Sequence, residues 1–369
     1  MIPPISPRLW AGSFASRESS IHQLAPYVGK MKSGMARVLI EHFSQPGEVI
    51  LDPFAGSGVV PYESVLQGRR AIANDLSPYA YMLTMGKLSA PTTEADALRE
   101  AEHYISRAES DAKTVRTNDI PTWVRAFFHP RTLSEVVLAV RLLYEEERYF
   151  LLACVLGILH HVRPGFLSYP ASHLTPYLRE RKYSRDEYPA MYAYRDLRSR
   201  LLAKVKRAYR RAPAWDRSLC WQVLRENTMS LSLATHSVDA IVSSPPYFGA
   251  LDYARDNRLR LWFLGVEDYH TLEQELTSKD QIYLEQMGPC LSELQRVLKP
   301  GRHCVLVLGD VERNGSRRDT AGVISELAAD HGFATEALID DQIPDDRRSR
   351  RRTKTTKREQ VLVMLNAGG

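Results

Sequence analysis

The sequence predicts an α/β fold built on an open, mostly parallel sheet that is interrupted by a mainly helical insertion. Two apolar runs predict the sheet: residues 49–52 break into a short turn of small residues, and residues 70–75 follow about twenty positions later. A third apolar run, 238–243, stops at two prolines. Between the second run and the strand expected at 220–224 the pattern is mostly helical. We therefore expect one sheet domain, residues 1–91 and 219–369, with residues 92–218 as an inserted helical domain.

The composition is that of an ordinary globular protein, with 44% hydrophobic and 25% charged residues in 369. Residues 1–17 lack the pattern of a signal peptide, and the longest apolar run, 149–159, is too short to cross a bilayer. The four cysteines lie far apart, which argues against a zinc site and disulfides. Cys290 follows Pro289 within a helical pattern, so we expect an inert, partly buried thiol. These features predict a cytoplasmic protein with no membrane and no metal requirement.

Positive charge is concentrated in two segments. Residues 179–211 hold twelve Lys and Arg against four Asp and Glu, and residues 347–358 hold eight basic residues and no acid. Together they carry about +16, although the net charge of the whole chain is +5. Such segregation indicates a surface for a polyanion.

The turn after the first apolar run reads Asp-Pro-Phe-Ala-Gly-Ser-Gly at residues 52–58. Gly56 and Gly58 lack a Cβ atom and tolerate positive φ, so a ligand can lie directly against this backbone. No Gly-Lys-Ser or Gly-Lys-Thr follows, which excludes a P-loop. Asp75 ends the next strand, where a ribose-binding carboxylate belongs in such sheets. The alternative for Asp75 is an N-cap of the helix that begins near Ser77.

Two strings in this sequence resemble the motifs of one family. The Asp52–Gly58 string resembles the S-adenosylmethionine motif of the amino-methylating DNA methyltransferases, which make N4-methylcytosine or N6-methyladenine. Ser244-Pro245-Pro246-Tyr247 matches the catalytic motif of the same family, in the version associated with N4-cytosine enzymes. The resemblance implies a Rossmann-like class I methyltransferase fold, a mixed seven-stranded sheet with an antiparallel edge hairpin. It also implies that S-adenosylmethionine is bound by Asp52, Pro53, Phe54, Ala55, Gly56, Ser57 and Gly58.

Other cofactor contacts follow from the same resemblance. Residues 22–40 are similar to the family segment that closes over the methionine end of the cofactor, with Tyr27, Gly29 and Lys30 as candidates. An ordinary loop and N-terminal helix is the alternative. The end of the third strand approaches the adenine ring in this class of fold, which favours Asn227 over Glu226 as its contact. Asn227 could instead cap the turn before Ser230.

The chemistry of an exocyclic amino group explains the catalytic motif. Its lone pair is delocalised into the ring, so a site must accept its N–H bonds and direct the lone pair to the methyl group. We expect the Ser244 side chain and the Pro245 carbonyl to accept these bonds, because Pro245 and Pro246 fix the backbone. Tyr247 would stack on a base flipped out of the duplex, and transfer would be a direct displacement. Asp252 and Tyr253 are secondary candidates beside the target base.

Basic side chains interleaved with tyrosines suit contacts with phosphates and bases. We expect target recognition at Arg179, Arg181, Lys182 and Arg185, and phosphate contacts at Arg348, Arg351, Arg352, Lys354 and Lys357. The alternatives are a solvated, salt-bridged surface for the first group and a solubilising segment for the second. The leading hypothesis is a site-specific DNA N4-cytosine methyltransferase acting on duplex DNA, with or without a cognate restriction endonuclease. N6-adenine methylation, RNA amino-methylation and a non-catalytic DNA-binding protein remain as rivals.

Overall fold

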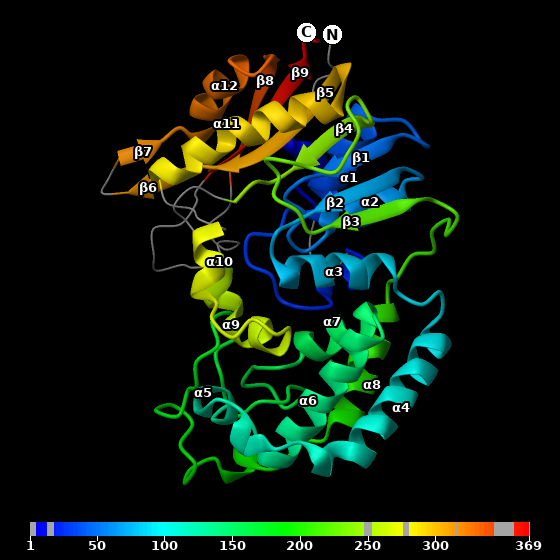
Figure 1. Cartoon of the computed structure of the whole chain (residues 1–369), viewed down its shortest axis with the longest axis vertical. Coiled ribbons are helices and arrows are strands. Elements are labelled where there is room, and N and C mark those ends of the chain that lie inside the picture. Colours follow the sequence, from blue (N-terminus) through cyan, green and yellow to red (C-terminus); the bar gives the residue numbers. More distant parts are fainter. Residues whose placement is uncertain are drawn as a thin grey trace.

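The computed structural model describes residues 5–12, 18–246, 253–275, 280–313, 316–342 and 358–368. These residues form a seven-stranded sheet with helices on both faces, and a helical part beside it (Figure 1).

The sheet has the strand order β3-β2-β1-β4-β5-β9-β8. Strands β1 to β5 are parallel, whereas β9 is antiparallel to both of its neighbours, β5 and β8. The predicted mixed sheet with an antiparallel edge hairpin is therefore confirmed. The strand bounds are β1 Val49–Asp52, β2 Arg70–Asn74, β3 Trp221–Leu224, β4 Val238–Ser243, β5 Leu298–Gly309, β8 Phe333–Gln342 and β9 Arg358–Asn366.

Helices cover both faces because the central strands are apolar on both sides. All four residues of β1 are buried: Ile50 packs in the cluster that includes α1, and Leu51 packs in the cluster that includes α11 and α12. The alternation of side chains along a strand thus divides the core into two layers. The helices flanking the sheet are α1 Ser33–Phe43, α2 Val59–Leu66, α3 Pro78–Leu88, α11 Asp280–Val297 and α12 Thr320–Ala329.

The helical part lies in the sequence between α3 and β3. Its core is continuous with that of α3, against which α7 packs. Residues 158–196 are irregular apart from one short 3-10 helix, so the proline-punctuated loop expected at 168–177 is longer than the sequence indicated. The elements here are α4 Glu94–Asp111, α5 Thr122–Arg125, α6 Pro130–Glu145, α7 Tyr149–Gly157 and α8 Leu197–Tyr209, with the 3-10 turns Ala112–Thr114, Thr117–Asp119 and Pro189–Tyr192.

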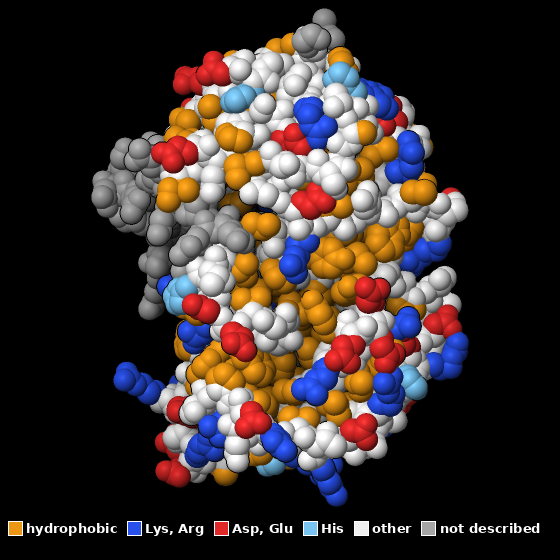
Figure 2. Space-filling view, viewed as in Figure 1, with side chains coloured by type: hydrophobic (Ala, Val, Ile, Leu, Met, Phe, Trp, Pro, Cys, Tyr) orange, Lys and Arg blue, Asp and Glu red, His pale blue; other side chains and the backbone are white. Residues whose placement is uncertain are grey.

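Two further helices, α9 (Tyr253–Phe263) and α10 (His270–Glu275), lie between the sheet and the helical part (Figure 1). On the face drawn in Figure 2, hydrophobic side chains gather across the middle of the molecule, and charges of both signs are mixed over the helical part. The remaining elements are the 3-10 turns Pro7–Leu9 and Ser20–Gln23 and the hairpin strands β6 Val311–Arg313 and β7 Ser316–Arg318. Among the described residues, no helix combines the length and apolar character needed to cross a membrane.

Candidate cofactor and catalytic site

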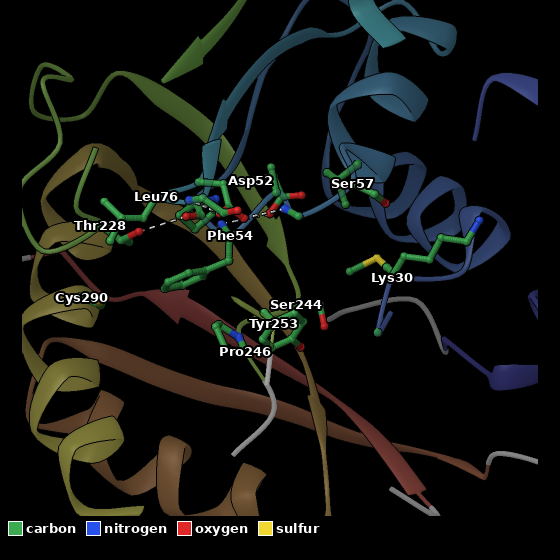
Figure 3. Close-up of a pocket in the computed structure, with 18 of the residues that line it drawn as sticks. Lys30, Asp52, Phe54, Ser57, Leu76, Thr228, Ser244, Pro246, Tyr253 and Cys290 are labelled. Atoms are coloured by element: carbon green, nitrogen blue, oxygen red, sulfur yellow. Dashed lines mark hydrogen bonds between the residues drawn. The ribbon is translucent and has the colours of Figure 1, made fainter. Parts of the chain in front are cut away.

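A cavity of about 470 Å³ opens at the carboxyl ends of the parallel strands. Residues that follow β1, β2, β3 and β4 contribute to its lining, as expected for a ligand site of an open α/β sheet. Figure 3 shows Asp52 and Phe54 at its centre, with Lys30 and Ser57 toward one end and Leu76 and Thr228 toward the other. The cavity size is within the usual range for a small-molecule site.

The two glycines of the turn have different roles. Gly56 has φ 51° and lines the cavity, and a Cβ atom there would meet Cε1 of Tyr27 at 3.1 Å. Gly58 has φ 69° and is the N-cap of α2. A Cβ on Gly58 would lie 2.6 Å from Oγ1 and 2.9 Å from Cα of Thr84, and this glycine does not line the cavity. The glycine is needed for the close packing of α2 on α3, and the expected ligand contact at Gly58 stays a prediction.

Asp52 is a buried carboxylate at the end of β1. Its Oδ1 accepts hydrogen bonds from Ser243 Oγ at 2.6 Å and from the amide of Phe54 at 3.3 Å. Burial raises the pKa of Asp52 to about 7, against the opposing effect of the Ser243 bond. Because burial disfavours the ionised form of Asp52, a cationic ligand that enters the cavity would favour that form and lower its pKa.

Asp75 joins the glycine turn to the start of α3. One carboxylate oxygen accepts from the amide of Gly56 at 2.8 Å, and the other accepts from the amide of Ser77 at 2.9 Å. Ser77, not Asp75, is the N-cap of α3, so the capping alternative for Asp75 is wrong. Burial raises the pKa of Asp75 to about 6. A carboxylate has further lone pairs, so Asp75 can still accept from a ribose hydroxyl in the cavity that it lines.

Asn74 links the ends of three strands, a role that the sequence did not reveal. Its side-chain amide donates to the carbonyls of Pro53 and Glu226 and to Thr228 Oγ1, while its Oδ1 accepts from the amide of Glu226. Thr228 Oγ1 in turn donates to the Pro53 carbonyl at 3.0 Å. Asn74 is fully buried, and this network fixes the turns after β1 and β3 relative to each other.

Asn227 and Glu226 differ in their position. Asn227 lines the cavity, but its Oδ1 accepts from the amide of Met229 at 3.0 Å and its carbonyl accepts from Ser230. It therefore shapes a local turn, as the alternative interpretation expected, while it borders the cavity. Glu226 does not line the cavity, because its carboxylate is bonded to the amide and hydroxyl of Ser232.

The segment before α1 forms the opposite end of the cavity. Tyr27, Gly29 and Lys30 all line it, as does Met31. The Tyr27 ring lies 6.0 Å from that of Tyr79 at an interplanar angle of 21° and 6.1 Å from that of Tyr253. The structure thus brings all three predicted residues to the cavity.

Helix α11 supplies a wall of the cavity that sequence reasoning missed. Tyr283, Gln286, Met287 and Cys290 line it, spaced so that they share one helix face. Burial raises the pKa of Cys290 to about 12, so its thiol is protonated, in accordance with the expectation of an inert thiol. The periodicity of this stretch was visible in the sequence, but it does not distinguish a cavity wall from ordinary core.

The catalytic motif meets the cavity through Ser244 and Pro246 (Figure 3). The Ser244 hydroxyl donates to the carbonyl of Val307 at 3.1 Å, which leaves its lone pairs free to accept. Pro245 is buried and does not line the cavity, so a direct contact by its carbonyl gains no support. Tyr247 and Asp252 lie outside the described residues. Tyr253, from α9, lines the cavity as well.

The predicted nucleic-acid-binding residues fall into two groups. Arg181, Lys182 and Arg185 are exposed, and Arg179 is half-buried, in the irregular segment before α8. The Arg185 guanidinium also lies 5.0 Å from the ring centre of Tyr169 and 4.4 Å from that of Tyr192. Arg348, Arg351, Arg352, Lys354 and Lys357 lie outside the described residues. Across the part of the chain that the structure describes, no cluster of His, Cys, Asp or Glu has the arrangement of a metal site.

Residues 8–85 match a family model described as DNA methylase, of the N6/N4 type. Among curated proteins, the chain is 29% identical over 72 residues to the type II methyltransferase M.MjaII of Methanocaldococcus jannaschii, covering 20% of this chain and 14% of that one. It is also 28% identical over 104 residues to the protein nucleotidyltransferase YdiU of Thiobacillus denitrificans, covering 28% and 21%. The chain thus spans a small fraction of the length of either relative.

Solved structures give looser likenesses. TrmN from Thermus thermophilus has a TM-score of 0.36 and 12% identity, covering 94% of this chain and 52% of that one. A DNA modification methylase from the same organism, complexed with S-adenosylmethionine, has a TM-score of 0.24 and 22% identity, covering 37% and 49%.

The matched residues 8–85 include the segment over the cavity, the glycine turn and Asp75, which are the parts that form the cofactor side of the site. The residues present suit S-adenosylmethionine: a glycine without a Cβ leaves room beside the backbone, and two buried carboxylates can hold an ammonium and ribose hydroxyls. Residues 8–85 are therefore similar to the amino (N6/N4) DNA methyltransferase family, and the cavity that they help to line suits S-adenosylmethionine.

Proposed function

We propose that this protein is a site-specific methyltransferase that modifies the exocyclic N4 of cytosine in duplex DNA, with the base flipped out of the helix. The observation that carries the proposal is the position of Ser244 at the cavity, one strand away from the glycine turn. S-adenosylmethionine supplies the methyl group, and the protein's own part is to hold donor and acceptor in line.

The Ser244 hydroxyl is suited to receive an amino group. Its proton is directed to the Val307 carbonyl, so its lone pairs can accept an N–H bond from a base. Accepting that bond turns the nitrogen lone pair toward the methyl group. We assign Tyr247 to stacking on the flipped base, as its place in the motif indicates.

Asp52 and Asp75 are the residues that we assign to the cofactor. Asp52 lies next to the turn and would pair with the methionine ammonium, and Asp75 would accept from the ribose. Asn227 and Thr228 border the adenine side, and Tyr27, Gly29 and Lys30 border the methionine side. Phe54 lies on the cavity between the two ends (Figure 3).

We further propose that residues 92–218 form the target-recognition domain, inserted in the catalytic domain of residues 1–91 and 219–369. Arg181 and Lys182 support this because they are exposed cations without a carboxylate partner among the described residues. N6-adenine methylation on the same scaffold is the first alternative, and methylation of an RNA amino group is the second.

The experiment is mass spectrometry of nucleosides from unmethylated DNA incubated with the protein and S-adenosylmethionine at low salt. N4-methylcytosine is the expected product. N6-methyladenine instead would overturn the base assignment while keeping the family, and no methylated base in DNA would move the search to RNA.

The Ser244→Ala variant tests the site itself. It should retain cofactor binding but lose at least about a hundredfold in rate, since one well-placed hydrogen bond to the reacting group is removed. The matched control is Ser325→Ala on α12, whose hydroxyl bonds that of Thr335 and does not line the cavity, so the rate should be unchanged. Equal rates for the two variants would contradict the role of Ser244.

A further inference from the structure

A chain of buried charged side chains lies beside the cofactor cavity without lining it. His22, Glu63 and Lys87 come from the segment before α1, from α2 and from α3, and their exposed fractions are 2%, 3% and 1%. Three ionisable side chains at this depth are costly unless they are paired. Neither the cofactor assignment nor the proposed catalysis uses them.

His22 is the centre of this network. Its Nε2 lies 2.8 Å from Glu63 Oε1, and its Nδ1 lies 3.4 Å from Lys87 Nζ. Burial lowers the pKa of Lys87 well below its usual value and raises the pKa of Glu63 to about 7. In the charged forms of these two groups, Lys87 donates to Nδ1, so Nε2 carries the proton and donates to the Glu63 carboxylate. Burial lowers the pKa of His22 well below its usual value, with a further contribution from Lys87, so the ring is neutral. This protonation state satisfies both bonds.

The network continues to the cavity through Lys30. The Lys30 ammonium donates to the carbonyl of His22 at 3.4 Å and lies 3.9 Å from the carboxylate of Glu18. Lys30 also lines the cofactor cavity, beside Gly29. The His22 residue therefore contacts α2 and α3 with its ring and Lys30 with its backbone.

The location of Glu63 makes this arrangement relevant to the cofactor. Glu63 lies on α2, the helix that begins directly after the glycine turn, and Arg37 of α1 approaches its second oxygen at 3.5 Å. These contacts thus attach the segment at one end of the cavity to α2, the helix that follows the glycine turn. Buried polar networks whose members are all satisfied rigidify a structure, so this one can hold the segment in place.

We propose that His22 is a positioning residue for S-adenosylmethionine: through Glu63 and Lys87 it holds the 26–31 segment, with Lys30, over the methionine end of the cavity. The inference rests on the cofactor side of the proposed function and not on the identity of the methylated base. Loss of the network should weaken cofactor binding and leave turnover at saturating cofactor almost unchanged.

The test is calorimetric titration of S-adenosylmethionine into the full chain and its Glu63→Gln and Lys87→Met variants. Both changes keep the size of the side chain and remove its charge. We expect the Kd to rise about tenfold in each, the effect of weakening one hydrogen bond to a charged group. The matched control is Glu135→Gln, because Glu135 is equally buried at 1% exposed and bonded to Tyr194 and Leu197 in the helical part. Glu135→Gln should lower the thermal midpoint without changing the Kd.

A double-mutant cycle with Lys30→Met tests whether Glu63 affects cofactor binding through Lys30. If Glu63 acts through Lys30, then Glu63→Gln adds no further loss of affinity in the Lys30→Met background. Additive losses would overturn the route through Lys30. Unchanged Kd values in both network variants, with a lowered thermal midpoint, would overturn the proposal and leave a purely structural network.

The readouts separate this inference from the proposed function. Wild-type protein that binds the cofactor but makes no N4-methylcytosine refutes the base assignment, whereas the Kd comparison still decides the role of the network formed by His22, Glu63 and Lys87. Lys30→Met changes an exposed residue and is expected to fold, so its Kd still tests the contribution of Lys30 to cofactor binding if a core variant does not fold.

Discussion

The Ser243 hydroxyl donates a hydrogen bond of 2.6 Å to Asp52 Oδ1, joining two strand ends that are 191 residues apart in the sequence. Both side chains are buried. This bond connects the cofactor turn to the residue directly before the catalytic motif, so the two motifs are fixed relative to each other by their own strands. It also orients the Asp52 carboxylate, whose protonation should affect cofactor binding.

Binding of S-adenosylmethionine should strengthen with rising pH between about 5.5 and 8. Burial raises the pKa of Asp52 to about 7 and that of Asp75 to about 6, so both are partly protonated in the free protein over this window. Only the ionised forms can pair with an ammonium and accept from ribose hydroxyls at full strength. Titration calorimetry across the window measures the effect, and a flat profile would contradict the assignment of both carboxylates.

Asp52→Asn should abolish most cofactor binding and stabilise the cofactor-free protein. Because the folded-state pKa of Asp52 lies above its unfolded value of about 3.8, stability is lost as pH rises from about 4 to 7. The asparagine removes that loss, which we expect to be about 1–3 kcal/mol at pH 8 by chemical denaturation. Asp239→Asn is the control: this carboxylate at the start of β4 is paired with Lys299 and has a lowered pKa, so its loss should destabilise.

Asn74→Ala should weaken cofactor binding and lower the free energy of unfolding by about 2–3 kcal/mol, since the backbone amide and carbonyl of Glu226 lose their side-chain partner and the Pro53 carbonyl keeps only Thr228. Turnover at saturating cofactor should change less than affinity. The matched control is Asn366→Ala, a fully buried asparagine that bonds the carbonyls of Gln295 and Leu298 elsewhere in the sheet. It should cost similar stability and leave the Kd intact. A normal Kd in Asn74→Ala would show that the turns after β1 and β3 do not depend on this amide.

Gly58→Ala and Gly56→Ala should fail in different ways. At Gly58 the new Cβ meets the Thr84 backbone at 2.9 Å with φ 69°, so we expect a loss of more than about 2 kcal/mol in stability. Thr84→Ala should not rescue it, because the clash with the backbone of residue 84 persists. At Gly56 the φ of 51° also strains alanine, but the close neighbour is the Tyr27 ring at the cavity and not backbone, so stability should fall less than at Gly58 and cofactor affinity should fall as well. Thermal melts with and without cofactor measure both, and a reversed order would refute the division of roles.

The double variant Arg181→Ala/Lys182→Ala should bind duplex DNA more weakly at low salt and with a shallower salt dependence. If each cation contacts one phosphate, the slope of log K against log salt falls by about 2. The control is Arg99→Ala/Lys113→Ala, which removes the same charge from exposed positions elsewhere on the helical part. Fluorescence anisotropy at several salt concentrations makes the comparison. Identical slopes for the two variants would remove these residues from the DNA surface.

The sequence was informative where function depends on local backbone chemistry. The places of the glycine turn, Asp75 and Pro246 at the cavity could be anticipated because each is a distinctive residue type at a strand end. Asn74 and Ser243 could not, because their roles depend on which strands become neighbours, and an Asn or Ser at a strand end is common. At Gly58 the residue type suggested a ligand, whereas the structure shows a second requirement for glycine that arises from Thr84 on another helix. The face of α11 that lines the cavity could not be predicted, because its sequence has an ordinary amphipathic pattern.

The place of β9 between β5 and β8 has a consequence for biosynthesis. Residues 303–309 of β5 pair with β9, which ends at Asn366, so the ribosome must translate this last strand before β5 gains its second neighbour. Until then the nascent chain presents an unpaired strand edge, a site where aggregation or chaperone capture can begin. Premature termination within the last strand would therefore yield a protein with a complete glycine turn on an incomplete sheet.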